Sequence, residues 1–358
     1  MPALHRLRFF LLPLAGLSLL AALWTGLARL GWDLPQPSLE WPSQHGPLMV
    51  IGFLGTLIGL ERAVALKHAW AYGAALLPAL AGVALLAGSP AASHVLAAGG
   101  SLFLVAIFVF LYRRQQELFL AIMGAAALLW FVGILLRHLG YPLSRVVPWW
   151  VGFLVLTIAG ERLELTRLMR LPESVRFKFV LAAGLFVCGL LWSIPSFDRG
   201  VWVSGMGLLA LAFWLLRHDL AWRTVRQRGL PRFMAICLLS GYAWLAVGSL
   251  LWIFFPDRLN GGPFYDAMLH SIFLGFVFAM IFAHAPVIFP SITGVAMPFQ
   301  RAFYGHVAFL HLSLALRVGA DLGVWLPGQK WGGLLNALAI LVFLANNIRA
   351  VKLGRSHT

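Results

Sequence analysis

The sequence predicts an all-α integral membrane protein with about twelve transmembrane helices. Of its 358 residues, 61% are hydrophobic and only 11% are charged, and the mean hydropathy is +0.87. Apolar runs of roughly 17 to 25 residues, the length that crosses a bilayer as a helix, follow one another along the chain. Because the connections are too short for a soluble domain, residues 1–358 are expected to form one polytopic helical domain.

The first expected span follows Arg6 and Arg8, as in a signal peptide. Its apolar run continues to Leu30 without a small-residue cleavage site, so we interpret it as a retained span. Cys188 and Cys237 lie alone in separate spans and are interpreted as packing residues, because neither a disulfide framework nor a thiolate metal motif is available. The twelve expected spans lie near residues 7–30, 45–66, 70–88, 92–112, 118–138, 146–168, 177–195, 200–217, 233–256, 264–290, 302–325 and 331–353.

The formal net charge of +15 is explained by its distribution. Most of the 27 Lys and Arg residues lie at the two termini and in the even-numbered loops. The positive-inside rule then places both termini in the cytoplasm. Membrane lipid is the expected partner, and a nucleic-acid partner is not predicted because the basic clusters are ordinary cytoplasmic loops.

Three Gly-Phe pairs mark the second, sixth and tenth expected spans, and an ionisable side chain follows each Phe by eight residues. The three sets are Gly52-Phe53 with Glu61, Gly152-Phe153 with Glu161, and Gly275-Phe276 with His284. The pattern predicts three four-helix pseudo-repeats, at residues 1–112, 113–217 and 218–358, in which these spans are equivalent inner helices. The alternatives are a chance match of apolar segments and, for the two Glu-Arg pairs, interfacial ion pairs.

Two histidines near the outer ends of equivalent spans suggest a haem site. His45 opens span 2 with Met49 one turn later, and His270 lies in the first turns of span 10. Haem iron takes two axial ligands from opposite sides, which two facing helices can supply. The alternative is two unrelated interfacial histidines. Arg317 in span 11 either holds a haem propionate or pairs with Asp321 within its helix.

A second group of polar residues is expected near the cytoplasmic face. His284 follows His270 by fourteen residues, about 21 Å along an α-helix, so one haem iron cannot use both. His284 should instead approach the start of span 11, where His306 and His311 point to different faces. Imidazoles with carboxylates suit copper, iron or zinc. The candidate ligands of this inner metal site are His284, His306, His311, Glu61 and Glu161.

Several short motifs resemble the NnrS family of bacterial haem-copper membrane proteins. They are His45-Gly46-Pro47-Leu48-Met49, Gly241-Tyr242-Ala243-Trp244-Leu245-Ala246, Asp266-Ala267-Met268-Leu269-His270 and Leu316-Arg317-Val318. The resemblance implies a twelve-helix protein that carries haem and copper, is akin to the respiratory oxidase core, and helps cells cope with nitric oxide. The chain departs from the family after span 10, where Ser291-Ile292-Thr293-Gly294-Val295 replaces a Gly-His-Thr-Gly-Arg turn.

The leading hypothesis, which follows from the resemblance, is a haem-binding protein of the bacterial inner (plasma) membrane, with copper as a candidate second cofactor. It would act in the nitric oxide response or nitrogen-oxide metabolism. Its small ligand would be a gas or a nitrogen oxide. Spans 6 and 7 lack the histidines that respiratory oxidases use for copper, so oxygen-reducing turnover is not predicted, and the pattern does not decide whether the protein is an enzyme. The alternatives are a metal-free proton-coupled transporter or channel and an assembly protein without a cofactor.

Overall fold

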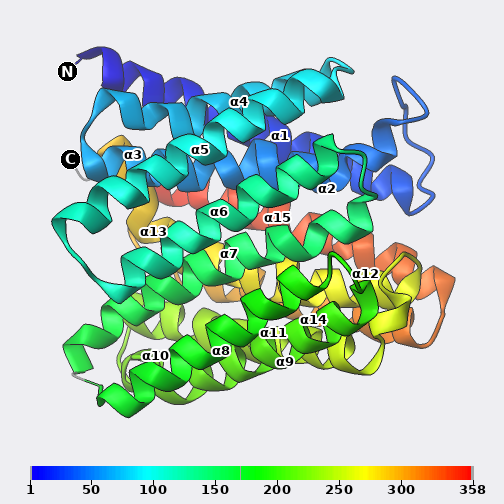
Figure 1. Cartoon of the computed structure of the whole chain (residues 1–358). Coiled ribbons are helices and arrows are strands. Elements are labelled where there is room, and N and C mark those ends of the chain that lie inside the picture. Colours follow the sequence, from blue (N-terminus) through cyan, green and yellow to red (C-terminus); the bar gives the residue numbers. More distant parts are fainter. Residues whose placement is uncertain (1, 170, 356–358) are drawn as a thin grey trace. The chain divides into compact units, whose positions relative to one another are not determined.

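The structure is a computed structural model that describes residues 2–169 and 171–355. Over this range the chain consists of helices joined by short connections, without a β-strand (Figure 1). Many large apolar side chains stay exposed, for example those of Phe10, Phe177 and Phe213. Helices that are apolar on their outward faces are typical of proteins surrounded by lipid. The predicted fold class, an all-α multi-pass membrane protein, is confirmed.

Within the described residues, eleven helical segments are long and apolar enough to cross a membrane. One further helix, α14 (Phe303–Leu322), has 20 residues but is not among them. It carries His306, His311, Arg317 and Asp321, which lower its hydropathy. The eleven segments are Arg6–Arg29, Trp41–Leu66, Ala69–Leu86, Pro90–Arg114, Leu118–His138, Leu143–Leu165, Glu173–Trp192, Phe197–His218, Leu230–Phe254, Pro263–Thr293 and Leu326–Gly354.

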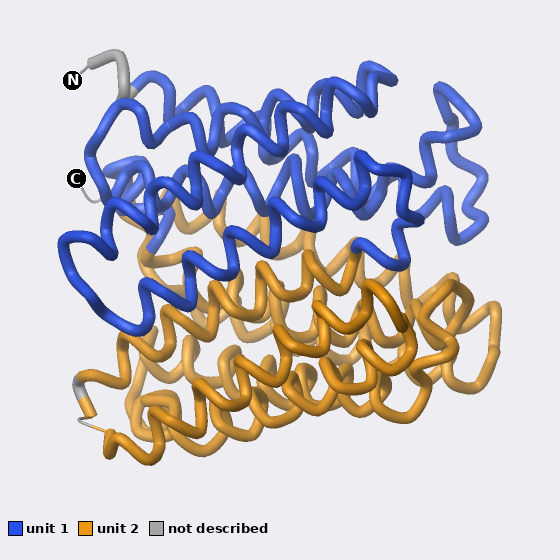
Figure 2. Tube along the Cα trace, viewed as in Figure 1, with its two compact units in different colours: residues 1–146, 288–295 blue, residues 147–287, 296–358 orange. Residues whose placement is uncertain are grey.

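The chain divides into two compact units, which Figure 2 colours separately. Unit 1 comprises Met1–Val146 and Ile288–Val295. Its helix α4 packs on α5, and α5 packs on α6. The central segment η2 packs on α1 and α4. The elements of unit 1 are α1 (Pro2–Arg29), η1 (Trp41–Gln44), α2 (His45–Pro47), η2 (Leu48–Gly55), α3 (Thr56–Leu66), η3 (Ala69–Tyr72), α4 (Gly73–Leu86), α5 (Pro90–Arg114) and α6 (Leu118–His138).

Unit 2 comprises Val147–Val287 and Ala296–Thr358. Its closest helix pairs are α8 with α9, α9 with α11, and α14 with α15. Both units cut across the predicted repeat boundaries. Besides α14, the elements that lie wholly or mainly in unit 2 are α7 (Leu143–Leu165), η4 (Thr166–Met169), α8 (Glu173–Trp192), α9 (Phe197–His218), α10 (Ala221–Thr224), α11 (Leu230–Phe254), η5 (Pro256–Arg258), α12 (Pro263–His270), η6 (Ser271–Phe278), α13 (Ala279–Thr293) and α15 (Leu326–Arg355).

The segments η2 and η6 are π-helices of eight residues each, one in each unit. Gly is the fifth residue and Phe the sixth in both, and the residue that follows each segment donates its N–H to the carbonyl of that Phe. Segments of this kind are rare and occur frequently at functional sites. The Gly-Phe pair of span 6 lies instead in regular α-helix, in α7. The structure therefore gives spans 2 and 10 a shared backbone feature that span 6 lacks.

Candidate functional site

Four charged or ionisable residues of unit 2 form what we call the His270 cluster: Asp266 and His270 of α12, and Arg317 and Asp321 of α14. Arg317 donates from Nε and approaches with Nη2, each 2.8 Å from Asp266 Oδ2. Asp321 interacts electrostatically with both Asp266 and Arg317. Because α12 packs directly on α14, the cluster joins two helices that are distant in sequence.

The hydrogen bonds of His270 fix which of its ring nitrogens carries the proton. Nδ1 lies 2.8 Å from the main-chain oxygen of Asp266 and 3.3 Å from its Oδ2. Oxygen atoms of this kind only accept, so Nδ1 carries the hydrogen and the lone pair of the neutral ring is on Nε2. Histidines that bind metals commonly have this arrangement, in which a carbonyl or carboxylate orients the ring.

Arg317 does not form the ion pair with Asp321 that was the alternative expected from their spacing. Its guanidinium turns to Asp266 on the neighbouring helix. Asp321 is 1% exposed, and its Oδ2 has no hydrogen-bond partner among the described residues. The spacing within one helix permitted the pair, but the carboxylate of another helix lies closer to the end of the Arg317 side chain.

His45 has the same proton position as His270 but belongs to unit 1. Its Nδ1 lies 2.7 Å from the main-chain oxygen of Ala22 in α1, so the lone pair is again on Nε2. Met49, one turn later, is buried. Relative to the Gly-Phe pairs the two histidines are offset: His45 precedes Gly52 by seven residues, and His270 precedes Gly275 by five. Their pairing around one iron stays a prediction.

The His45 ring packs against Gly26, where there is no side chain. Substitution of Gly26 therefore tests this contact. A Cβ at Gly26 would lie 2.7 Å from His45 Nδ1. We expect Gly26→Ala to displace the imidazole and to destabilise the protein by about 1–3 kcal/mol, the usual effect of overpacking. Thermal unfolding in detergent measures it, with Gly16→Ala on the same helix as control, because nothing lies within 4 Å of a Cβ there. Equal stability of the two variants would contradict the contact.

A second group, the Arg162 cluster, lies in unit 2 and consists of Arg162 of α7, Asp219 after α9, and Tyr242 of α11. Arg162 donates to both carboxylate oxygens of Asp219, from Nε at 2.7 Å and from Nη2 at 3.0 Å. Tyr242 donates its hydroxyl to Oδ2 at 3.0 Å, and the N–H of Ala221 donates to Oδ1 at 2.7 Å. All three side chains are buried, so the cluster is a fully hydrogen-bonded ion pair.

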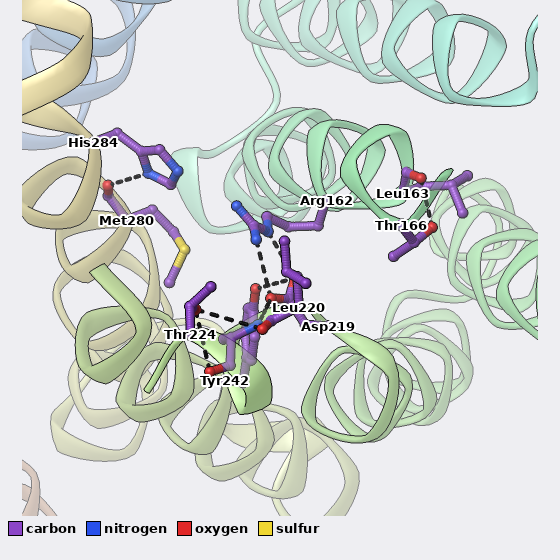
Figure 3. Close-up of polar contacts among 10 residues, drawn as sticks. Arg162, Leu163, Thr166, Asp219, Leu220, Thr224, Tyr242, Met280 and His284 are labelled. Atoms are coloured by element: carbon purple, nitrogen blue, oxygen red, sulfur yellow. Dashed lines mark hydrogen bonds and ion pairs between the residues drawn. The ribbon is translucent and has the colours of Figure 1, made fainter. Parts of the chain in front are cut away.

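Figure 3 shows His284 and Met280 projecting from α13 on the side where Arg162 lies. His284 Nδ1 lies 2.8 Å from the main-chain oxygen of Met280, so this histidine also has its lone pair on Nε2. The helix continues past it through Pro286 to Thr293. The three histidines associated with the Gly-Phe pairs, His45, His270 and His284, thus share one proton position.

His306 and His311 of α14 have the opposite proton position. Trp244 donates to Nδ1 of His311 at 3.0 Å, and Ser240 lies 2.8 Å from its Nε2. Asn346 donates to Nδ1 of His306 at 3.1 Å. Since Nδ1 accepts in both rings, Nε2 carries the hydrogen and no lone pair is left for a metal. These bonds disfavour the predicted role of the two residues as ligands.

His306 is instead surrounded by aromatic rings. The rings of Phe282, Phe343 and Phe303 have their centroids 4.9, 5.3 and 5.5 Å from that of the imidazole. His306 is 1% exposed and its Nε2 has no hydrogen-bond partner in the described structure. A buried imidazole packed among aromatic rings suits a packing role.

The two predicted carboxylate ligands lie in different units. Glu61 of α3 approaches its neighbour Arg62, with Oε1 3.5 Å from Nη2. Glu161 of α7 precedes Arg162, which forms a buried ion pair with Asp219. Across residues 2–169 and 171–355, no three His, Cys, Asp or Glu side chains are grouped so as to hold a metal ion. The inner site of His284, His306, His311, Glu61 and Glu161 therefore stays a prediction without an assembled ligand group.

Residues 8–352 match the family described as "Domain of unknown function (DUF8744)". The chain belongs to this family. No curated protein and no solved structure matches the DUF8744 chain significantly.

Sequence reasoning missed the role of three residues in this DUF8744 protein: Asp219, Tyr242 and Asp266. Asp266 precedes His270 by four residues, and this spacing alone could have indicated that the two side chains meet. Tyr242 was noted only as part of a motif that resembles a known family, and the motif does not indicate that its hydroxyl bonds to Asp219. Asp219 lies among the basic residues of a connection, where a lone acid suggests a surface ion pair, and no local pattern links it to Arg162.

Proposed function

We propose that this protein is a haem-binding protein of the bacterial inner membrane, of the NnrS type, with both termini in the cytoplasm. In this proposal it acts in the response to nitric oxide or in nitrogen-oxide metabolism. His45 and His270 are the axial ligands, and a gas or a nitrogen oxide is the small ligand. Lipid surrounds the protein, and nucleic acid is not a partner.

The observation that carries this proposal is the proton position of the two histidines. In His45 and in His270, Nδ1 donates to a main-chain carbonyl, so Nε2 is the atom that can bind a metal. Asp266 adds a carboxylate beside His270, which increases the basicity of a ligating ring. His45 precedes a π-helix by three residues and His270 by one, and π-helices are common at functional sites.

Haem held by these residues would supply a redox-active iron, to which a gas can bind. Met49 lies one turn after His45 and offers a replaceable thioether. Arg317, the other predicted cofactor residue, would hold His270 in place through Asp266. Copper is the second cofactor of the proposal, near His284 and Met280, because imidazole and thioether are ligands that copper accepts.

Absorption spectroscopy of the purified protein tests the haem proposal. After haem-replete expression, we expect a Soret band that shifts on reduction and on addition of nitric oxide. Replacing His270 by Ala should remove the band, and so should His45→Ala. The control His218→Ala should retain it, because His218 lies at the end of α9 beside Trp214 and belongs to neither site.

The same spectra distinguish the outcomes. One shared iron predicts that either substitution alone abolishes the spectrum of two axial histidines. Two independent sites predict that each substitution removes only part of the absorbance. A colourless wild-type protein from haem-replete cells would refute the proposal, and equal band loss in the His218→Ala control would show that the effect is unspecific.

A second candidate function is a metal-free proton-coupled transporter or channel. It is favoured by the buried ionisable groups of the two clusters, because such groups inside a membrane protein commonly mark proton or substrate paths. Proteoliposomes with an internal pH indicator measure it. Proton flux in colourless protein, reduced by His284→Ala, would support transport, whereas haem absorbance without flux would oppose it.

A further inference from the structure

A pocket of about 380 Å³ lies in unit 2, where the connection from α11 to α12 meets the turn between α14 and α15. We call it the Arg258 pocket. Its volume is within the range of about 300–1,000 Å³ that is usual for small-ligand sites. No residue of the haem or copper proposals lines it. The lining residues that matter for the argument are Asp257, Arg258, Asn260, Phe264 and Val324.

Aromatic rings hold the guanidinium of Arg258. Its central carbon lies 4.5 Å from the ring centre of Phe264 and 5.8 Å from that of Phe255. The two rings are themselves 4.7 Å apart. A guanidinium stacked on an aromatic face keeps its N–H groups free at the edge. Arginine binds phosphate oxygens through two parallel hydrogen bonds from this edge, so the pocket presents a phosphate-binding group.

Asp257 gives the same pocket a charge of opposite sign. None of the ion pairs among the described residues includes Asp257 or Arg258, and both side chains are exposed. A simple anion is repelled by the carboxylate, and a metal cation is repelled by the guanidinium. A zwitterion that carries a phosphate and an ammonium group is attracted by both, because carboxylates accept charge-assisted hydrogen bonds from ammonium.

The surface next to the pocket is apolar and lies at helix ends. One candidate membrane-crossing segment ends at Phe254, and two others begin at Pro263 and Leu326. Phe254, Val324, Trp325 and Leu326 are all exposed. Tryptophan is typical of the boundary between membrane and water. The ligand that fits this position therefore has acyl chains as well as a zwitterionic head group.

The backbone of the pocket is strained at Val324. Its φ angle of 51° lies in the left-handed region, where a β-branched residue is a genuine outlier. Such conformations cost free energy and cluster at ligand-binding sites. This observation is independent of the charges, and it points to the same place.

We propose that the Arg258 pocket binds the head group of phosphatidylethanolamine, with the phosphate on Arg258 and the ammonium group on Asp257. The amide of Asn260 is a further donor for the phosphate oxygens. The acyl chains lie along the exposed side chains of Phe254 and Trp325. Binding is non-covalent, and it does not depend on haem.

Lipid titration of the full-length protein in detergent, followed by native mass spectrometry, tests the proposal. We expect the wild type to bind phosphatidylethanolamine more tightly than phosphatidylglycerol, which has the phosphate but no amine. Arg258→Gln should weaken binding of phosphatidylethanolamine about two- to fivefold, the effect of losing a partly exposed ion pair. Asp257→Asn should abolish the preference between the two lipids, because it removes only the partner of the amine.

Arg199→Gln is the matched control. Arg199 is exposed and follows Asp198 in the first turn of α9, as Arg258 follows Asp257, but it does not line the pocket. It should bind phosphatidylethanolamine like the wild type. Equal binding of the two lipids by the wild type, or an equal effect of Arg258→Gln and Arg199→Gln, would overturn the proposal.

Soluble phosphoethanolamine distinguishes a lipid from a free phosphate ester. It has the same two charges but no acyl chains, so it should not displace phosphatidylethanolamine at equal concentration. Displacement at equal concentration would overturn the assignment of the ligand as a lipid. The substituted side chains of Asp257 and Arg258 are exposed, so both variants should fold like the wild type.

Discussion

Replacing Asp219 by Ala is expected to lower the free energy of unfolding by about 3–5 kcal/mol, the usual effect of removing one partner of a buried ion pair. The substitution would leave the Arg162 guanidinium buried without its anion, and Tyr242 without its acceptor. The loss of the bond from Ala221 would release the start of α10 as well. Unfolding in a denaturing detergent, followed by circular dichroism, measures the change.

Two comparisons make this expectation specific. Asp198→Ala removes an exposed acid from the first turn of α9, the helix that Asp219 directly follows. It should change the free energy of unfolding by less than about 0.5 kcal/mol, as for most surface positions. The double variant Arg162→Met with Asp219→Leu should be more stable than Asp219→Ala, because no unpaired charge is left buried. If Asp219→Ala unfolded like the wild type, the ion pair would contribute nothing to the fold.

Replacing Gly207 by Ala is expected to separate α8 from α9. A Cβ at Gly207 would lie 2.3 Å from the main-chain nitrogen of Phe186 and 2.5 Å from its Cα. A side chain can turn away from such a clash, but backbone cannot, so the two helices must move apart. Overpacking of this kind costs about 1–3 kcal/mol and sometimes more. The stability measurement used for Asp219→Ala reports it.

Gly184 provides the matched control for this substitution, because it lies in α8 and a Cβ there would meet nothing within 4 Å. Gly184→Ala should be neutral or stabilising by up to about 1 kcal/mol, since Ala favours the helix over Gly. Of the two Gly→Ala changes, only Gly207→Ala is therefore expected to destabilise the protein. Equal destabilisation by both would mean that the close approach of α8 and α9 is not what requires Gly207.

The fold class could be predicted from the sequence because lipid imposes a simple constraint on composition. Runs of apolar residues have to be helical in a bilayer, and their length reveals them. Helix α14 shows the limit of that rule, because its Arg317 is paired inside the protein with Asp266. A polar helix of this kind can be recognised only from its contacts with other helices, and the amino-acid composition carries no information about those contacts.

The candidate site was only partly predictable. The spacing of His45 and Met49 is a local relation that the sequence gives directly, but Met49 lies in the π-helix η2, where α-helical spacing no longer fixes direction. The partner of Arg317 was not predictable, since Asp266 comes from a helix 51 positions earlier in the chain. The same holds for Arg162 and Asp219, 57 positions apart. Proton positions on histidines are likewise set by neighbouring carbonyl and amide groups that no spacing rule identifies.

The two π-helical segments change how sequence positions translate into directions around a helix. A π-helix has more residues per turn than an α-helix, so side chains after η2 and η6 are rotated relative to an uninterrupted α-helical wheel. Helix α7 contains no such segment. Glu61, Glu161 and His284 each follow their Phe by eight residues. Relative to that Phe, Glu61 and His284 therefore project in one direction around their helices, and Glu161 projects in another. The spacing recurs three times along the chain, but it gives the same side-chain direction around the helix in only two of the three copies.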